Sequence, residues 1–227
     1  ARAELERAID LEARYHGGTD YVDYGMVMVC SLYGGAFLDL FDLPFVVDGF
    51  NAILGDGCIV YAYTSSSMPP GGTNYSRRIH VDCPRLIPGF RTNFGAMFLL
   101  DDFTEENGAT WFLSGSHTRA EPPSADEFFP RAERLLAPAG SIFFFDPRLW
   151  HSGEVNRTSR WRHALTVNVC RPWMKQRLDI PRLMAGMDLG TLSDAARQKL
   201  GFLARVPASY DEYYAPPAER AYRQKTE

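Results

Sequence analysis

Two residues near the middle of the chain, His80 and Asp82, have side-chain types and a spacing that suit metal binding. Side chains alternate between the two faces of an extended segment, so positions i and i+2 point the same way. A histidine nitrogen and a carboxylate oxygen on one face can bind the same metal ion, with Val81 and Cys83 on the opposite face. Alone, a His-x-Asp match is a weak signal, because a surface histidine beside an aspartate in a turn fits it too.

A third ligand is offered by His151, which follows the apolar segment 142–145. Two histidines and one carboxylate form the facial triad that holds Fe(II) in non-haem oxygenases and leaves positions open for a co-substrate and oxygen. Basic residues follow His151, and a planar guanidinium binds a carboxylate through two parallel hydrogen bonds. Arg160 and Arg162 share a strand face, so parity does not choose between them. We interpret Arg157 as a solvated surface arginine.

The elements that must position these residues have the pattern of short β-strands separated by turns. Their signals are β-branched and aromatic residues bounded by glycine, proline and asparagine. Strands are predicted at 58–64, 92–100, 110–113, 141–145 and 164–169. Short strands with this spacing favour a sandwich or jelly roll over alternating strand–helix units. The predicted fold class is mainly β with flanking helices.

Helical patterns flank the strands. Helices are predicted at 1–16, within 26–45, at 124–136 and at 191–203. Each prediction rests on apolar residues that recur at helical spacing or on an apolar stretch bounded by glycines. The final segment, 208–227, is aromatic, charged and contains prolines, which suits a lid, an interface segment or partial disorder.

The pattern predicts a single domain over 1–227. Its β core covers roughly 53–175, preceded by a helical part at 1–50 and followed by a helical tail at 176–227. The chain begins at Ala1 inside a charged helical pattern, so we expect the natural N-terminus to lie upstream.

Composition excludes several classes of partner. A net charge of −4 gives no broad basic surface for nucleic acid or an anionic membrane. No apolar run reaches the ~18 residues that a membrane-spanning helix needs. The four cysteines are widely spaced without a CxxC pair, which indicates reduced thiols and no zinc site. We expect a cytoplasmic protein with a small-molecule substrate; its oligomeric state is left open.

Three linked segments are more specific than any single residue: HVD at 80–82, LLDDFTEENGATWFLSGSH at 99–117 and WHSGEVNRTSRWRHALTVN at 150–168. In order and spacing they resemble the phytanoyl-CoA dioxygenase family of Fe(II)/2-oxoglutarate-dependent oxygenases, over roughly 53–175. The resemblance implies a double-stranded β-helix, a cupin-like jelly roll whose two sheets enclose the metal. It also implies Fe(II) as cofactor, 2-oxoglutarate as co-substrate, and O2.

Carried over position by position, the resemblance makes His80, Asp82 and His151 the iron ligands and the catalytic centre. Arg162, eleven residues after His151, falls where the family has the arginine that binds the distal carboxylate of 2-oxoglutarate. Met97 stands where many relatives carry an aromatic residue near the co-substrate, and this departure leaves its contact open.

Further residues are candidates for binding the co-substrate or substrate. Asn156 matches a polar family position beside the site, although a plain turn role fits it equally. Tyr63, Ser65 and Ser67 share one strand face; we assign Ser65 to the co-substrate and the other two to the substrate. Arg77, three residues before His80, either binds an anionic substrate group or is an exposed charge.

The expected activity is hydroxylation or another oxidation of a small-molecule C–H bond. Candidate substrates are natural-product intermediates, amino acids and acyl-thioesters, free or tethered to a carrier protein. Asp82 argues against halogenation, because halogenating relatives lack this carboxylate. Two other readings stay open: a cupin-like metalloenzyme that does not use 2-oxoglutarate, and a non-catalytic jelly-roll binding protein. Addition of 2-oxoglutarate to the Fe(II) protein tests the first, and metal uptake tests the second.

Overall fold

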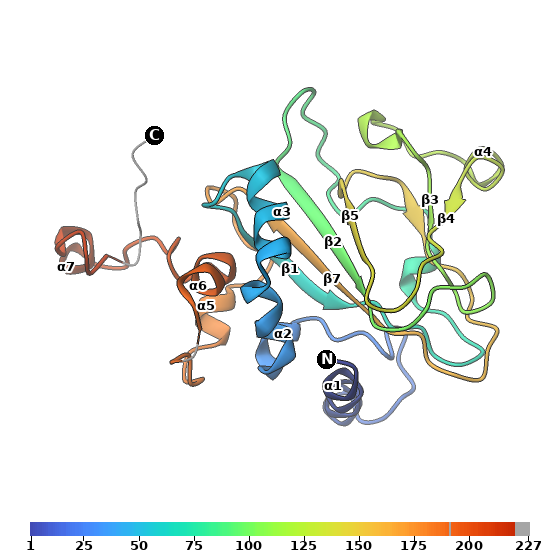
Figure 1. Ribbon diagram of the computed structural model, residues 1–227, viewed down its shortest axis with the longest axis horizontal. Helices are drawn as coiled ribbons and strands as arrows, with labels where there is room; N and C mark the ends of the chain where they lie inside the picture. The colour runs from blue at the N-terminus through green and yellow to red at the C-terminus, as the bar shows by residue number, and fades with distance from the viewer. Residues whose placement is uncertain (191, 221–227) are drawn as a thin grey trace.

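A computed structural model describes residues 1–190 and 192–220 (Figure 1). Residue 191, at the start of the predicted C-terminal helix, and residues 221–227, at the end of the predicted tail, lie outside the described residues.

The larger sheet has four antiparallel strands and forms one wall of the fold. In spatial order they are β1 (Ile59–Ser65), β7 (Ala164–Cys170), β2 (Asn93–Leu99) and β5 (Ile142–Phe145). Alternation along β7 separates its two faces: Leu165 and Val167 enter the main hydrophobic core, while Thr166 and Asn168 line a cavity. The sheet therefore carries apolar packing on one face and site residues on the other.

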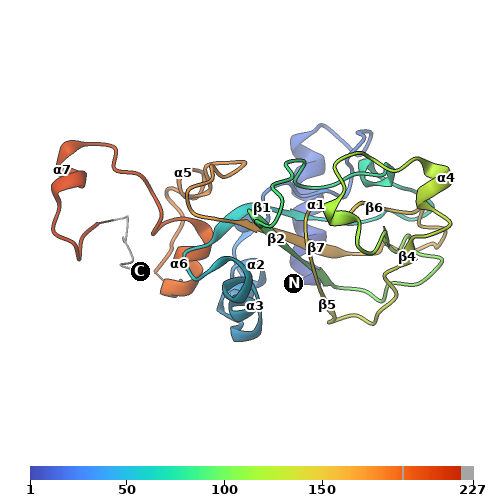
Figure 2. The same cartoon turned by 90° about the horizontal axis from the view of Figure 1, so that it is seen from above.

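The smaller sheet faces this cavity from the other side. It consists of β4 (Glu133–Arg134), β3 (Trp111–Phe112) and β6 (His151–Ser152), in that order. Figures 1 and 2 show it set apart from the larger sheet, on the side of the short helix α4 (Ala125–Phe128). Two antiparallel sheets around a central cavity form the jelly roll, and the predicted fold class is confirmed.

Helices cover the outer face of the larger sheet and flank its ends (Figure 1). They are α1 (Arg2–Tyr15), α2 (Ala36–Asp39), α3 (Pro44–Leu54), α5 (Ile180–Leu183) and α6 (Asp194–Leu200), whereas α7 (Tyr210–Tyr214) extends away from the sheet (Figures 1 and 2). Phe37, Phe41 and Phe50 from the N-terminal helices pack with the strand residues in one buried cluster. This burial, worth about 1.5–3 kcal/mol for each large apolar side chain, holds the sheet rigid behind the cavity.

The predicted helix at 124–136 is wrong over most of its length. Ser124 caps α4 by accepting a hydrogen bond from the backbone nitrogen of Glu127, but the helix ends at Phe128. Pro130 has no backbone N–H with which to continue the helical hydrogen bonds, and residues 133–134 instead pair with β3. The helix predicted at 191–203 is present over the shorter range of α6. Among the described residues, no helix is long and apolar enough to cross a membrane.

Candidate metal centre and its cavity

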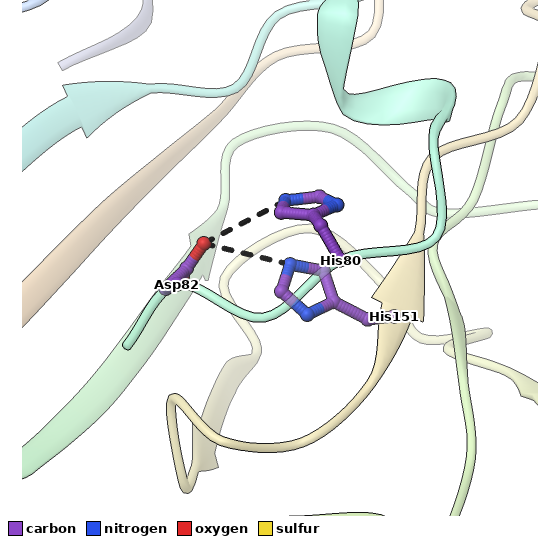
Figure 3. A group of neighbouring side chains, drawn as sticks. All are labelled: His80, Asp82 and His151. Carbon is purple, nitrogen blue, oxygen red and sulfur yellow. Dashed lines mark ion pairs between the residues drawn. The ribbon is translucent and has the colours of Figure 1, made fainter. Parts of the chain in front are cut away.

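His80, Asp82 and His151 come together around a single point (Figure 3). The Nε2 atoms of both histidines lie 3.7 Å from Oδ1 of Asp82. One ligand atom from each residue lies within 4.8 Å of the other two. The backbone sets this arrangement, because His80 and His151 form an antiparallel bridge with two hydrogen bonds of 2.9 Å. The structure thus brings the three sequence-predicted ligands to one place.

Backbone carbonyls determine which nitrogen of each histidine is free. Nδ1 of His80 lies 2.8 Å from the carbonyl oxygen of Arg78, and Nδ1 of His151 lies 2.8 Å from that of Leu149. A carbonyl only accepts hydrogen bonds, so Nδ1 of each neutral ring carries the hydrogen and donates it. The lone pair of each Nε2 then points toward Asp82, which is the arrangement that a divalent metal ion requires.

The carboxylate of Asp82 is held by an asparagine that the sequence reasoning missed. Nδ2 of Asn168 donates a 3.0 Å hydrogen bond to Oδ2 of Asp82, which leaves Oδ1 facing the histidines. Asn168 and Thr166 have the same parity on the predicted last strand and line the same cavity, so strand alternation is the signal that could have found Asn168.

Burial and charge keep His80 neutral. Desolvation and the neighbouring His151 together lower the pKa of His80 from its ordinary value of 6.5 to about 4, against the opposing effect of Asp82. A neutral imidazole is the form that binds metal, so the site is ready for a cation at neutral pH.

The metal-free protein is therefore expected to lose stability as the pH falls from about 6.5 toward 4. Between these values the unfolded chain binds a proton at His80 that the folded chain does not, so the free energy of unfolding decreases with falling pH. Urea unfolding across this range measures the slope. His80→Gln should flatten it, whereas His16→Gln, at an exposed histidine, should not. An unchanged slope in His80→Gln would contradict the assignment.

A cavity of about 90 Å³ adjoins the three residues. Its wall combines apolar side chains such as Met97, Phe143 and Phe145 with polar ones such as Thr110 and Thr166. Met97 and Ser65, both predicted to contact the co-substrate, line this cavity. The hydroxyl of Ser65 is already engaged, because it accepts from the backbone nitrogen of Val27 and donates to the carbonyl of Gly25.

Arg162 is fully buried and forms no direct ion pair among the described residues, although the carboxylate of Asp101 is close enough to oppose the fall of its pKa. Its Nη1 and Nη2 donate to the carbonyls of Ser66 and Gly108 at 2.8 and 2.9 Å, and its guanidinium lies 4.2 Å from the centroid of the Phe103 ring. Its Nε is buried with no hydrogen-bond partner. Arg162 is not on the cavity wall, but Ser66 is, so the guanidinium lies one hydrogen bond behind the wall.

An anion bound beside Arg162 would stabilise its buried charge. Burial lowers its pKa well below the ordinary value, because a charge in an apolar setting is costly without a counter-ion. The two rivals differ sharply: Arg160 is exposed, and Arg157 is exposed and ion-paired with Glu154 at 3.5 Å. Burial therefore distinguishes Arg162 from Arg160, whereas their shared strand face did not.

The other predicted residues lie elsewhere. Asn156 has a turn role, since its amide donates to the carbonyls of Met68 and Arg160 and its oxygen accepts from Thr158. Arg77 is exposed and is absent from the cavity wall. This geometry agrees with the turn role of Asn156 and the exposed charge of Arg77, the alternatives that the sequence left open beside a binding role.

Tyr63 and Ser67 also do not face the cavity. Tyr63 belongs to the main core and donates a 3.0 Å hydrogen bond to the carbonyl of Phe37, while Ser67 bonds to Nδ1 of His163 at 2.9 Å. On β1 the cavity is lined by Tyr61, Ala62 and Thr64 together with Ser65. The register of β1 shifts between Val60 and Ala62. A local sequence pattern does not predict which side chains of such an irregular strand face the cavity.

The comparisons with known proteins agree with this geometry. Residues 38–164 match the model of the phytanoyl-CoA dioxygenase family. The uncharacterized protein Rv1501 of Mycobacterium tuberculosis is 32% identical over 208 residues, which cover 88% of this chain and 76% of that protein. The dioxygenase af480 of Aspergillus fumigatus is 31% identical over 127 residues, which cover 53% of this chain and 40% of that protein.

A solved structure shares the fold. The non-haem α-ketoglutarate-dependent carbocyclase SnoK from nogalamycin biosynthesis aligns with a TM-score of 0.55 at 22% identity, covering 76% of each chain. The family model matches more than half of the chain, and a relative above 30% identity covers most of it. The matched residues 38–164 include His80, Asp82 and His151. The chain belongs to the phytanoyl-CoA dioxygenase family.

Proposed function

We propose that the protein is a non-haem Fe(II)- and 2-oxoglutarate-dependent dioxygenase that hydroxylates or otherwise oxidises a C–H bond of a small molecule. The observation that carries the proposal is the convergence of two imidazole Nε2 atoms and one carboxylate oxygen, from His80, His151 and Asp82, beside a cavity. Family membership and the fold shared with SnoK support an oxygenase.

The residues present fit both implied groups. Two neutral imidazoles and one carboxylate are the donor set that suits Fe(II) and leaves coordination positions open. The buried Arg162, with an unpartnered Nε and no direct ion pair among the described residues, fits the distal carboxylate of 2-oxoglutarate. When bound, iron and 2-oxoglutarate would supply the activation of O2 that C–H oxidation requires.

The side chains of the protein would bind, orient and exclude water. Arg162 would fix the co-substrate through its distal carboxylate, and Asn168 would hold Asp82 with Oδ1 toward the metal. Met97, Phe143 and Phe145 would keep the cavity dry and hold the target carbon near the open coordination positions.

The proposal is tested by adding 2-oxoglutarate to the anaerobic Fe(II) protein. Chelation is expected to produce a weak visible charge-transfer band, and substrate-dependent succinate release is expected in air. Metal uptake without the band would favour a cupin-like enzyme that does not use 2-oxoglutarate. Absence of metal uptake would favour a binding protein. Natural-product intermediates, amino acids and acyl-thioesters form the first substrate panel.

Asn168→Ala is expected to weaken Fe(II) binding by about 10- to 100-fold, the range typical of residues that orient a metal ligand. Without the hydrogen bond to Oδ2, Asp82 is free to rotate out of the triad. Anaerobic competition with a chelator measures the affinity. Asn107→Ala, which removes an asparagine bonded only to the backbone of a turn, is the matched control. Equal affinities for wild type and Asn168→Ala would remove this role.

A further inference from the structure

Arg177 lies on the wall of the cavity and comes from a part of the chain far from the triad in sequence. Its backbone nitrogen donates a 3.0 Å hydrogen bond to the carbonyl of Tyr61 on β1. The preceding Gln176 donates through Nε2 to the carbonyls of Val60 and Leu200, at 2.7 and 3.2 Å. The backbone that carries Arg177 is therefore tied to the sheet, although the side chain itself is exposed.

The guanidinium of Arg177 has no hydrogen-bond or ion-pair partner among the described residues. Of the described residues that line the cavity, Arg177 alone is an arginine or lysine; the other ionic groups there belong to the triad. Tyr75 lines the same wall, and its ring lies beside His80, with centroids 6.2 Å apart. A cation without an ion-pair partner in the described part of the chain thus borders a cavity whose wall mixes apolar and polar side chains.

Arg177 and Arg162 lie toward opposite ends of β7. Arg162 precedes this strand, six residues before Asn168, which corresponds to about 20 Å of extended chain. Tyr61, whose carbonyl holds Arg177, lies between Val60 and Ala62, which are paired with Val169 and Asn168. Because Asn168 is bonded to Asp82, the triad lies near the end where Arg177 is anchored. The proposed co-substrate would use the arginine at the other end, which leaves Arg177 without an assigned partner.

We propose that Arg177 binds an anionic group, a carboxylate or a phosphate, on the substrate, and that the substrate is a small molecule with an apolar body and one anionic end. The apolar body would lie against Met97, Phe143 and Phe145 beside the metal ligands. The anionic end would lie at Arg177, which can offer two parallel charge-assisted hydrogen bonds. This inference rests on the proposed function, because it concerns the same cavity.

Matched pairs of probes test the inference without knowledge of the natural substrate. The anaerobic protein is loaded with Fe(II) and saturating 2-oxoglutarate, and the charge-transfer band is recorded. 4-Phenylbutyrate and its amide, then phenethyl phosphate and phenethyl alcohol, are titrated while perturbation of the band and heat of binding are followed. At least one anion is expected to bind about tenfold more tightly than its neutral counterpart, as for a hydrogen bond to a charged group. The two pairs separate carboxylate from phosphate recognition.

Variants test whether Arg177 is the residue that causes the preference for anionic over neutral probes. Arg177→Gln should reduce the anion preference to about onefold, whereas Arg177→Lys should keep part of it because the charge remains. Arg77→Gln removes an exposed arginine that does not line the cavity and should leave the preference unchanged. In all variants the band itself should form as in wild type, since Arg177 is not a residue of the metal or co-substrate site.

The outcomes separate this inference from the proposed function. Absence of the band before any probe is added contradicts the proposed function. A normal band with equal affinity for anion and neutral partner, no binding of any anion, or a preference that survives in Arg177→Gln overturns the role of Arg177 alone. An anion that removes the band has displaced 2-oxoglutarate and counts against the inference as well.

Discussion

Asp82→Ala is expected to lower both Fe(II) affinity and substrate-dependent succinate formation by more than about 100-fold, because loss of a direct ligand exceeds the 10- to 100-fold effect of an orienting residue. Asp82 supplies the only carboxylate of the described His-Asp-His cluster, and its Oδ1 lies 3.7 Å from both Nε2 atoms. Two neutral imidazoles alone would leave the charge of a divalent cation uncompensated. Chelator competition under anaerobic conditions gives the affinity, and succinate assays give the turnover.

The control for Asp82→Ala is Asp10→Ala, at an exposed aspartate on α1. It removes the same carboxylate from a surface position and should retain the metal affinity and turnover of wild type. Asp82→Ala must also keep the circular-dichroism spectrum of the wild-type protein, so that lost binding is not lost folding. Equal turnover by wild type and Asp82→Ala would exclude the triad as the metal site.

Arg162→Gln is expected to weaken 2-oxoglutarate binding by about 30- to 1000-fold, the effect of truncating one partner of a buried charge pair. Fe(II) affinity should stay close to that of wild type, because Arg162 does not belong to the His-Asp-His cluster. The charge-transfer titration gives the dissociation constant of the co-substrate. The thermal shift that 2-oxoglutarate produces in the wild-type protein should disappear in the variant, since ligand stabilisation follows affinity.

The controls for Arg162→Gln are Arg160→Gln and Arg157→Gln, which remove the two exposed arginines nearby. Neither should change the dissociation constant. Arg162→Lys keeps the charge but not the planar fork and should show intermediate binding. If Arg160→Gln weakened binding and Arg162→Gln did not, the co-substrate would be assigned to Arg160. The buried guanidinium of Arg162 would then need another anion.

Residue order alone was enough to predict the class of fold and the three residues of the candidate metal site. The pairing of His80 with Asp82 came from alternation along an extended segment, which is a local rule, whereas His151 was assigned through the spacing of the family's segments. Strand signals are local as well, so the strands of the larger sheet were predicted close to their observed bounds. Three linked segments, at 80–82, 99–117 and 150–168, supplied the resemblance to the family.

Tertiary structure decided what depends on contacts between distant segments. Arg160 and Arg162 share parity, and only packing shows that Arg162 is the one buried over Phe103. Tyr63 turns into the core because an irregularity in β1 and helix packing set its direction. Arg177 reaches the cavity through a hydrogen bond to Tyr61, and no periodicity connects those two positions. Local pattern specifies the strand and its alternation, whereas burial and the neighbours across the fold determine which side chains meet in the cavity.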